Sequence, residues 1–488
     1  MDQSNMVRYL LPIVMLRTPR LSDASMVPLY RQLYDFIRSE IETGTLCDGE
    51  RLPATRELAV QIGLNRTTVS AAYGLLEAEG LIKGHVGRGS FVNYEPSSVR
   101  PQAPAGGMIS FASSRPSDVE FPMSDLSATL REVSASAEMA SILQLGAPGG
   151  FAPLRRYLLE HAREEGSARA DDDILITSGC QQALDLLQRV LAASGETVVV
   201  EDPVYHGLKN VFARGGTRLL GVSVGRDGAD LDALSRILKA ERPQLAVLTP
   251  NFQNPTGATM PEESRHRVAE AAYASGTLLV ENDIYGDLRY EGEPLPTIKQ
   301  SGGIGQVALM RSFSKLAFPG LRVGWVIAPR PLIARLAEAK QWCDLHTDQL
   351  SQAVLLRFAE SGRLAEHRSR MRASGAVRLR TVLAACARHL PQGTEWTRPE
   401  GGMSLWVRLP EPLDAAELLP RAERANVSYL PGRHFAVTRP DPCALRLSFG
   451  ALTPEQIEEG IARLGRVCRE ELQRVSSAPG YETAPAVV

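Results

Sequence analysis

A lysine stands among apolar and small hydroxyl residues in the stretch 312–325 (SFSKLAFPGLRVGW). An amine buried in such surroundings loses part of its preference for the charged form, and a neutral amine attacks an aldehyde to form a Schiff base. Ser312, Ser314 and Arg322 are close enough along the chain to hold a phosphate carried by that aldehyde. Lys315 is therefore predicted as the covalent anchor of pyridoxal 5'-phosphate. For this stretch alone, the alternative is a buried loop from which a lysine snorkels to solvent.

Four further stretches place polar or aromatic side chains where predicted strands end. The first is a strand-to-helix junction, whose free N–H groups and helix dipole attract a phosphate. The second supplies a ring able to stack on a pyridine, the third an amide donor for a phenolic oxygen, and the fourth acids and a phenol. The residues concerned are Gly179, Cys180, Gln181, Tyr205, Asn254, Asn282, Asp283 and Tyr285.

Strand and helix patterns alternate along the segment that carries these residues. Strands are predicted at 173–179, 197–201, 245–248, 277–281 and 307–310, and helices at 180–191, 230–240 and 262–275. This alternation predicts an α/β domain with a mostly parallel sheet covered on both faces. Ligands bind at the carboxyl ends of strands in such sheets, so the candidate residues should meet there. From about 350 to 470, long helical patterns and strands at 404–408 and 444–449 predict a smaller α+β subdomain.

The N-terminal part, residues 25–93, has a different pattern. Apolar residues at helical spacing predict a helix over 29–41 that stops at Gly44. Thr55 is expected to cap a short second helix and Asn65 a third, with Gly63 in the turn, which together form a helix-turn-helix. The segment 80–92 (GLIKGHVGRGSFV) predicts a β-hairpin wing with glycines 84, 87 and 89 in its turn.

The positive residues of this part are placed for contact with DNA. The third helix opens with Arg66, Thr67 and Thr68, which would meet base edges or phosphates in a major groove. The overall balance over residues 21–95, seven Lys and Arg against ten Asp and Glu, excludes a broadly basic module. The basic side chains nevertheless lie on the reading helix, its approach and the wing: Arg51, Arg56, Arg66, Lys83 and Arg88. A helical protein–protein domain with solvated charges is the alternative.

The length and composition bound the organisation of the chain. A chain of 488 residues is too long for one core, so at least two domains are expected. The segment 94–108 is rich in Pro, Gly, Ala and Ser, which predicts a linker between the domain 25–93 and the domain 109–474. A leader (1–24) is expected before the first domain and a disordered tail (475–488) after the second. Six scattered cysteines without metal-ligand spacing, and no signal peptide, predict a cytoplasmic protein without a metal site.

The N-terminal part resembles the winged-helix domain of the GntR family over roughly seventy residues. The resemblance rests on Leu52-Pro-Ala-Thr-Arg56, Leu58-Ala59, Arg66-Thr-Thr-Val69, Ala72-Tyr73, Leu76, Gly80 and the wing Gly87-Arg-Gly-Ser-Phe-Val92. It implies that the residues at four positions contact operator DNA: Arg56, Arg66, Thr68 and Gly89.

The second part resembles fold type I aminotransferases, the aspartate aminotransferase group, over residues 109 to about 470. The resemblance implies that Lys315 is the Schiff-base lysine, that Tyr205 stacks on the cofactor ring, and that Asn254 and Tyr285 contact its 3'-oxygen. It implies that Arg446, in Leu-Arg-Leu-Ser-Phe, grips a substrate α-carboxylate bidentately. The phosphate would be held by Cys180, Gln181, Ser312, Ser314 and Arg322.

Three residues depart from that pattern. The aspartate that faces the pyridine nitrogen normally stands three residues before the tyrosine, where this chain has Asn282, with Asp283 one residue on. Either Asp283 takes the role in a shifted register, or the cofactor is a poor electron sink and transamination is weak. Cys180 replaces a hydroxyl residue of the phosphate cup, and Leu145 replaces a tyrosine that reaches the neighbouring subunit.

Both parts together resemble MocR-type regulators, which fuse a winged helix to an aminotransferase-like domain. The resemblance implies a homodimeric, DNA-binding transcriptional regulator that senses pyridoxal phosphate or an amino compound through an aldimine at Lys315. A working aminotransferase with an accessory DNA-binding domain is the second hypothesis. The third is a repressor whose second domain only dimerises and binds no cofactor.

Overall fold

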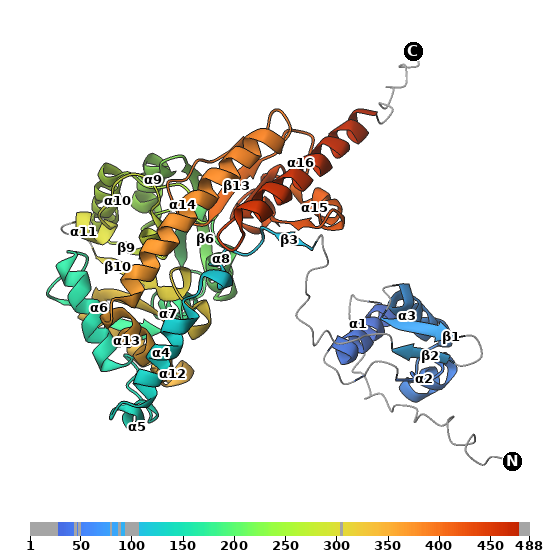
Figure 1. Ribbon diagram of the computed structural model, residues 1–488, viewed down its shortest axis with the longest axis horizontal. Helices are drawn as coiled ribbons and strands as arrows, with labels where there is room; N and C mark the ends of the chain where they lie inside the picture. Colours follow the sequence, from blue (N-terminus) through green and yellow to red (C-terminus); the bar gives the residue numbers. More distant parts are fainter. Residues whose placement is uncertain are drawn as a thin grey trace. The chain divides into compact units, whose positions relative to one another are not determined.

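The chain divides into two units, Met1–Ala105 and Gly106–Val488, which are described separately. The computed structural model describes residues 28–42, 46, 50–78, 81–85, 89–92, 107–302 and 306–477 (Figure 1). The predicted leader 1–24, most of the predicted linker 94–108, and Arg88 lie outside these residues. Among the described residues, no helix is both long and apolar enough to cross a bilayer.

The smaller unit is a winged helix-turn-helix, as predicted. Its elements are α1 (Leu29–Glu42), α2 (Thr55–Ile62), α3 (Arg66–Ala78), β1 (Ile82–His85) and β2 (Gly89–Val92). The apolar positions at helical spacing form one buried cluster that includes Leu33, Leu58 and Val69. The two strands pair antiparallel, with Ile82 opposite Val92, and form the wing.

The start of α2 differs from the prediction. Thr55 is the first residue of the helix, and the N-cap is Ala54, which has no side chain able to accept a hydrogen bond. Instead, the Glu57 carboxylate accepts from the Ala54 backbone N–H at 3.1 Å. The expectation that Thr55 caps this helix is therefore wrong, because Ala54 occupies the N-cap position and the carboxylate of Glu57, three residues after it, pairs with its backbone N–H. Asn65 lies as expected, with its Oδ1 accepting from the Thr67 N–H at 3.1 Å.

The wing glycines are placed differently from the prediction as well. Gly84 and Gly89 lie within the paired strands rather than in the turn, opposite Ser90 and His85 respectively. Gly89 has a φ of +102°, a conformation that favours glycine. Gly87 lies outside the described residues.

The larger unit is built around an eight-stranded sheet (Figure 1). In spatial order its strands are β4 (Asp172–Thr177), β11 (Gly324–Pro329), β10 (Val307–Ser312), β9 (Leu278–Asn282), β8 (Leu245–Leu248), β5 (Thr197–Asp202), β6 (Arg218–Gly225) and β7 (Gly228–Ala229). The five strands from β10 to β6 are mutually parallel, whereas β11 runs against β10 and β4, and β7 against β6. The mostly parallel sheet is confirmed. The sequence analysis does not predict β6 and β11, since β11 begins within the stretch assigned to the lysine loop.

Helices cover both faces of this sheet. On one face lie α7 (Cys180–Leu191), α8 (His206–Arg214) and α12 (Arg330–Asp344). On the other lie α6 (Ala152–Glu164), α9 (Leu231–Glu241), α10 (Glu262–Ser275), α11 (Ile298–Ser301) and α13 (Gln349–Glu360), with α4 (Met123–Ser134) and α5 (Met139–Ile142) packed outside α13. Strand β9 contributes side chains to both faces of the sheet, because Val280 packs in the cluster with α7 and Leu279 in the cluster with α9.

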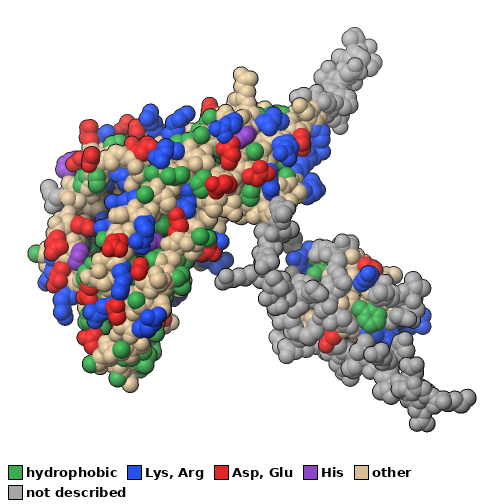
Figure 2. All heavy atoms as spheres, viewed as in Figure 1, with side chains coloured by type: hydrophobic (Ala, Val, Ile, Leu, Met, Phe, Trp, Pro, Cys, Tyr) green, Lys and Arg blue, Asp and Glu red, His purple; other side chains and the backbone are tan. Residues whose placement is uncertain are grey.

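The smaller subdomain is α+β, as predicted. Helices α14 (Arg363–His389), α15 (Ala415–Arg424) and α16 (Pro454–Ser477) pack on the antiparallel sheet β12 (Glu395–Trp396), β13 (Ser404–Arg408), β16 (Ala444–Ser448) and β15 (Leu430–Pro431). Strand β3 (Ile109–Ser110) pairs with β14 (Val427–Ser428) beside them. Helix α16 extends to Ser477, into the segment predicted as a tail. Charged side chains of both signs are interspersed over the visible face of this unit (Figure 2).

Candidate cofactor and effector site

The candidate residues of the larger unit meet at one edge of the large sheet. Strands β4, β5, β8, β9 and β10 run in the same direction, so their carboxyl ends lie along one edge. The loops that leave these ends carry the predicted residues, and Arg446 comes from β16 of the smaller subdomain. This arrangement agrees with the rule that ligands bind at strand carboxyl ends in open α/β sheets.

Lys315 lies in a short 3-10 turn, Phe313–Lys315, directly after β10. Its Nζ donates to the Ser114 carbonyl oxygen at 2.6 Å and lies 5.5 Å from the centre of the Tyr285 ring. The Ser114 carbonyl therefore fixes the position of the amine that the sequence analysis predicts as the covalent anchor.

Tyr285 is buried and its hydroxyl has two partners. Asn254 Nδ2 donates to it at 3.3 Å, and Ser114 Oγ lies at 3.2 Å. Burial alone would raise the pKa of Tyr285. The positive charges of Lys315 and Arg446 and these hydrogen bonds outweigh burial and lower the pKa. The phenol is thus prepared to share negative charge with a neighbouring oxygen.

The expected phosphate cup is formed by the start of α7 and by Arg322. Gly179, the N-cap of α7, has a φ of +77°, and a Cβ placed there would lie 2.4 Å from Arg322 Nη2. Arg322 Nη1 donates to Ser314 Oγ at 3.4 Å, and Ser312 Oγ donates to Ser314 Oγ at 3.0 Å. Ser312 Oγ also donates to the Val323 carbonyl oxygen at 3.0 Å, so the hydroxyl left to donate is that of Ser314. Free N–H groups of a helix start, a hydroxyl and a guanidinium are donors that suit a phosphate.

Two predicted members of this cup have other partners. Cys180 Sγ donates to the Arg311 carbonyl oxygen at 3.4 Å, and burial raises the pKa of the thiol to about 12. Gln181 Nε2 donates to the Gly207 carbonyl oxygen at 3.1 Å. Their side chains are therefore held by backbone carbonyls, and the backbone N–H groups of α7 remain the donors that this helix offers.

Tyr205 and Arg446 flank the site on the side of the smaller subdomain. Tyr205 is half-buried on the α7 face, and burial is the main reason why its pKa is raised. Arg446 is buried, with its guanidinium 4.9 Å from the centre of the Phe435 ring. It donates to Asn254 Oδ1 at 2.9 Å and to the Ala112 carbonyl oxygen at 2.5 Å. Its buried Nε has no partner among the described residues.

Asn282 and Asp283 point to opposite faces of the sheet. Asn282 follows Val280 at an interval of two and lies on the α7 face, where its Nδ2 donates to Thr249 Oγ1 at 3.2 Å. Its Oδ1 is buried without a partner in the described part of the chain. Asp283 accepts from Asn251 Nδ2 at 2.7 Å and from Arg311 Nε at 3.0 Å.

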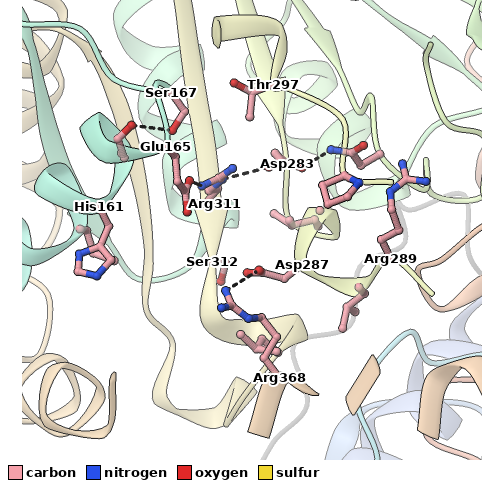
Figure 3. A pocket seen from close by; sticks show the side chains of 18 of the residues that line it. His161, Glu165, Ser167, Asp283, Asp287, Arg289, Thr297, Arg311, Ser312 and Arg368 are labelled. Atoms are coloured by element: carbon pink, nitrogen blue, oxygen red, sulfur yellow. Dashed lines mark hydrogen bonds and ion pairs between the residues drawn. The ribbon is translucent and has the colours of Figure 1, made fainter. Parts of the chain in front are cut away.

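The Asp283 carboxylate lines a separate pocket of about 590 Å³ (Figure 3). Glu165 and Arg311 form an ion pair at 2.8 Å in the same pocket, and Arg368 and Asp287 form another at 3.1 Å. The structure therefore brings Asn282, and not Asp283, to the face that carries Cys180 and Tyr205.

The smaller unit exposes most of the residues predicted to contact DNA. Arg56 on α2, Arg66 and Thr67 at the start of α3, and Lys83 on β1 are exposed, and Thr68 is half-buried. Arg51 is half-buried and forms a β-bridge with Phe91 of the wing, and its side chain lies against Gly89. The start of α3 is thus presented to solvent while its other face is packed in the core.

Several residues of the site were missed by the sequence analysis. Ser114 contacts both Lys315 and Tyr285, and Phe435 lies against Arg446. Thr249 holds the Asn282 amide. Ser114 comes from a segment about two hundred residues before Lys315 in the chain, and no local pattern marks such a contact. Thr249, which directly follows a predicted strand, could have been found from its position.

Comparisons with known proteins agree with the two units. The family "Aminotransferase class I and II" matches residues 108–464, and "Bacterial regulatory proteins, gntR family" matches residues 29–92. The chain is 30% identical to the "Probable rhizopine catabolism regulatory protein MocR" of Rhizobium meliloti, over 90% of this chain and 93% of the relative. The chain is a MocR-like member of the aminotransferase class I and II family. The predicted family is thereby confirmed.

The larger unit of this MocR-like chain is also similar to enzymes. It is 35% identical to "Aromatic-amino-acid aminotransferase 1" of Thermococcus litoralis, over 75% of this chain and 89% of the relative. A crystal structure of alpha-aminoadipate aminotransferase from Thermus thermophilus, complexed with N-(5'-phosphopyridoxyl)-L-leucine, has a TM-score of 0.71 and 35% identity over 78% of this chain and 98% of that chain.

The site of the MocR-like chain fits pyridoxal 5'-phosphate, the cofactor of this family. The donors at Gly179 and Arg322 could bind its phosphate, and the Lys315 amine could react with its aldehyde. Tyr285 and Asn254 match a phenolic oxygen. When bound, the cofactor supplies an electrophilic carbon to which amines attach covalently.

Proposed function

We propose that the chain is a cytoplasmic transcriptional regulator whose aminotransferase-like unit binds pyridoxal 5'-phosphate at Lys315 and senses a small amine. The observation that carries the proposal is the full-length similarity to the regulator MocR, with a DNA-reading helix and an intact lysine site in one chain. A regulator needs both parts, whereas an aminotransferase needs only the second.

The proposed DNA contacts come from the exposed start of α3. Arg66, Thr67 and Thr68 would meet base edges or phosphates, while Arg56 and Lys83 would contact the backbone from the adjoining helix and the wing. The Arg51 side chain lies against Gly89, the first residue of β2, and so would position the wing. Binding should therefore combine a salt-dependent phosphate part with a smaller sequence-specific part.

The proposed effector is an amine that carries a carboxylate. Its amino group would replace the Lys315 amine on the cofactor carbon, while Arg446 binds its carboxylate through the free Nε and its neighbours. Released from the cofactor, the Lys315 amine would be free to donate to the carbonyl oxygen of Ser114, which lies just after β3 and beside Tyr285. A homodimer with paired winged helices would transmit this change to two half-sites on DNA.

A working aminotransferase is the second candidate, and the 35% identity to an aromatic-amino-acid aminotransferase supports it. Fast transamination requires a positively charged ring nitrogen that withdraws electrons, and Asn282 carries no charge to stabilise one. The two candidates predict different products. An enzyme converts its cofactor to the amine form and releases a keto acid, whereas a sensor forms a complex and stops there.

The test is a spectrum of the purified protein with pyridoxal 5'-phosphate, followed by addition of single amino acids. The proposed function expects a visible band that Lys315→Ala abolishes, a shift with some amino acids, and no keto acid. A DNA fragment selected from random sequence by the purified protein should then bind differently with and without the effective amino acid. Stoichiometric keto acid would favour the enzyme. A protein that stays colourless but binds DNA would favour a repressor without cofactor.

A further inference from the structure

We propose that Asn282 keeps the ring nitrogen of the bound cofactor unprotonated, so that the site exchanges amines at Lys315 without removing their Cα protons. The inference rests on the proposed function and deepens it, because it assigns to one residue the difference between sensing and turnover. Three observations carry it.

The first observation is the orientation that the site imposes. A phosphate at the α7 start and Arg322, an aldehyde at Lys315, and a phenolic oxygen at Tyr285 fix three substituents of one ring. The nitrogen of pyridoxal phosphate lies across the ring from the aldehyde carbon, on the side away from Lys315. The buried amide of Asn282 lies on the same face, where one end of it pairs with Thr249 and the other end lacks a partner among the described residues. It is the group placed to meet that nitrogen.

The second observation is that the neighbouring carboxylates serve elsewhere. Asp283 lies on the opposite face, where Asn251 and Arg311 occupy both of its oxygens (Figure 3). Glu201 on β5 is buried, and its Oε2 accepts from Gln253 Nε2 at 3.2 Å. Burial raises the pKa of Glu201 to about 8, so this group is mostly uncharged at neutral pH. Neither side chain supplies a negative charge to a ring beside Asn282.

The third observation is the charge around the site. Arg322 lies close to the Cys180 thiol and Arg446 close to the Tyr285 phenol, and both guanidinium groups are cations. A protonated ring nitrogen would add a further positive charge without an anionic partner, which lowers its pKa. The Asn282 amide can satisfy the neutral nitrogen instead. In the structure Nδ2 donates to Thr249 Oγ1; with the amide turned about its last bond, Nδ2–H would face the nitrogen and Oδ1 would face the Thr249 hydroxyl.

The chemistry that remains is amine exchange. The nitrogen of the incoming amine would form a double bond to the cofactor carbon as the double bond from that carbon to Lys315 Nζ breaks, and two protons would pass from the incoming nitrogen to Nζ. No electrons leave or enter, so no oxidant or reductant is required. Removal of a Cα proton is different, since it leaves an electron pair that a neutral ring accepts poorly. Asn282 therefore favours a complex that forms and dissociates without conversion.

The test uses pyridoxal 5'-phosphate labelled with ¹⁵N in the ring and bound to the full chain. The ¹⁵N NMR shift of the ring nitrogen reports its protonation directly and does not depend on turnover. The inference expects an unprotonated signal at neutral pH in the native protein. In Asn282→Asp, a carboxylate close to the nitrogen should raise its pKa by roughly 1–3 units and move the signal to the protonated position. The same variant should gain conversion of the cofactor to the amine form by amino acids.

Asp283→Asn is the matched control, because it removes the adjacent carboxylate from the opposite face. Its ring nitrogen should remain unprotonated, as in the native protein. A protonated signal in the native protein at neutral pH would overturn the inference even if the variants failed to fold. A signal that becomes unprotonated only in Asp283→Asn would assign the role to Asp283. Cofactor that binds through Lys315 but is protonated refutes this inference alone, whereas cofactor that does not attach to Lys315 refutes the proposed function.

Discussion

Replacement of Arg446 by lysine gives a quantitative test of the carboxylate site. The guanidinium is buried, rests on the Phe435 ring, and already donates to Asn254 and to the Ala112 carbonyl. Its Nε–H is the donor without a partner among the described residues, so a ligand carboxylate would complete the group. Lysine keeps the positive charge but offers a point charge in place of the planar fork.

The expected loss follows from the number of hydrogen bonds removed. Arg446→Lys should remove about one charge-assisted hydrogen bond to the carboxylate, worth roughly 1.5–3 kcal/mol. Because about 1.4 kcal/mol corresponds to a factor of ten, the affinity for a carboxylate-bearing amine should fall by roughly 10- to 150-fold.

The assay is an absorbance titration of the cofactor-loaded protein with two matched ligands. Leucine carries the carboxylate, and isopentylamine is the same side chain without it. The variant should lose affinity for leucine and keep its affinity for isopentylamine within about threefold. An equal loss for both ligands would refute the reasoning, since Arg446 would then act through Asn254 on the cofactor rather than on the carboxylate. No loss for either would exclude Arg446 from the site.

Three further predictions address the other parts of the molecule. Arg66→Ala should weaken DNA binding and reduce the slope of log affinity against log salt by about one, whereas Arg31→Ala on α1 should leave the slope unchanged; titrations of selected DNA at several salt concentrations measure both. Gly179→Ala places a Cβ 2.4 Å from Arg322 Nη2 and should weaken cofactor binding by at least about tenfold, because it displaces a charge-assisted donor. The control Gly195→Ala, at a glycine with a similar positive φ and open space around it, should destabilise the fold without weakening cofactor binding. Equilibrium dialysis measures cofactor binding, and thermal unfolding measures stability. Burial raises the pKa of Glu201 from 4.5 to about 8, so its neutral form contributes stability that is fully present below about pH 4.5 and is lost as the pH rises through about 8. Glu201→Gln should remove this contribution to the fall in unfolding free energy, at most about 1.4 kcal/mol per pH unit, and parallel pH dependences in urea unfolding of the two proteins would contradict the assignment.

Local patterns were sufficient to predict most strands of the large sheet, although not β6 and β11, and to mark the candidate residues that the structure brings to its carboxyl edge. Lys315 is marked by its own neighbours in the sequence, and the strand ends are marked by the change from apolar to polar residues. Which of Asn282 and Asp283 lies on the α7 face of the sheet could not be predicted. Side chains alternate between the two faces along a strand, so a shift of one residue exchanges them. The packing of Val280 with α7 and of Leu279 with α9 resolves this choice.

Contacts between distant segments were the other limit. Ser114 reaches Lys315 only because β3 pairs with β14 of the smaller subdomain and directs the following residues across the site. The cap of α2 was mispredicted for a local reason. Thr55 and Glu57 are both residue types that occur at helix starts, and only the extended backbone of Ala54 shows that the helix begins at Thr55.

The Asn254 side chain uses both ends of its amide, accepting from Arg446 and donating to Tyr285. In the proposed function, this one amide would span the place for the amine's carboxylate and the place for the cofactor's oxygen. Any adjustment that improves one contact is transmitted to the other, and thermodynamic linkage makes the effect equal in both directions. We therefore expect a regulator built on this amide to respond to cofactor and amine jointly rather than to the concentration of either one alone.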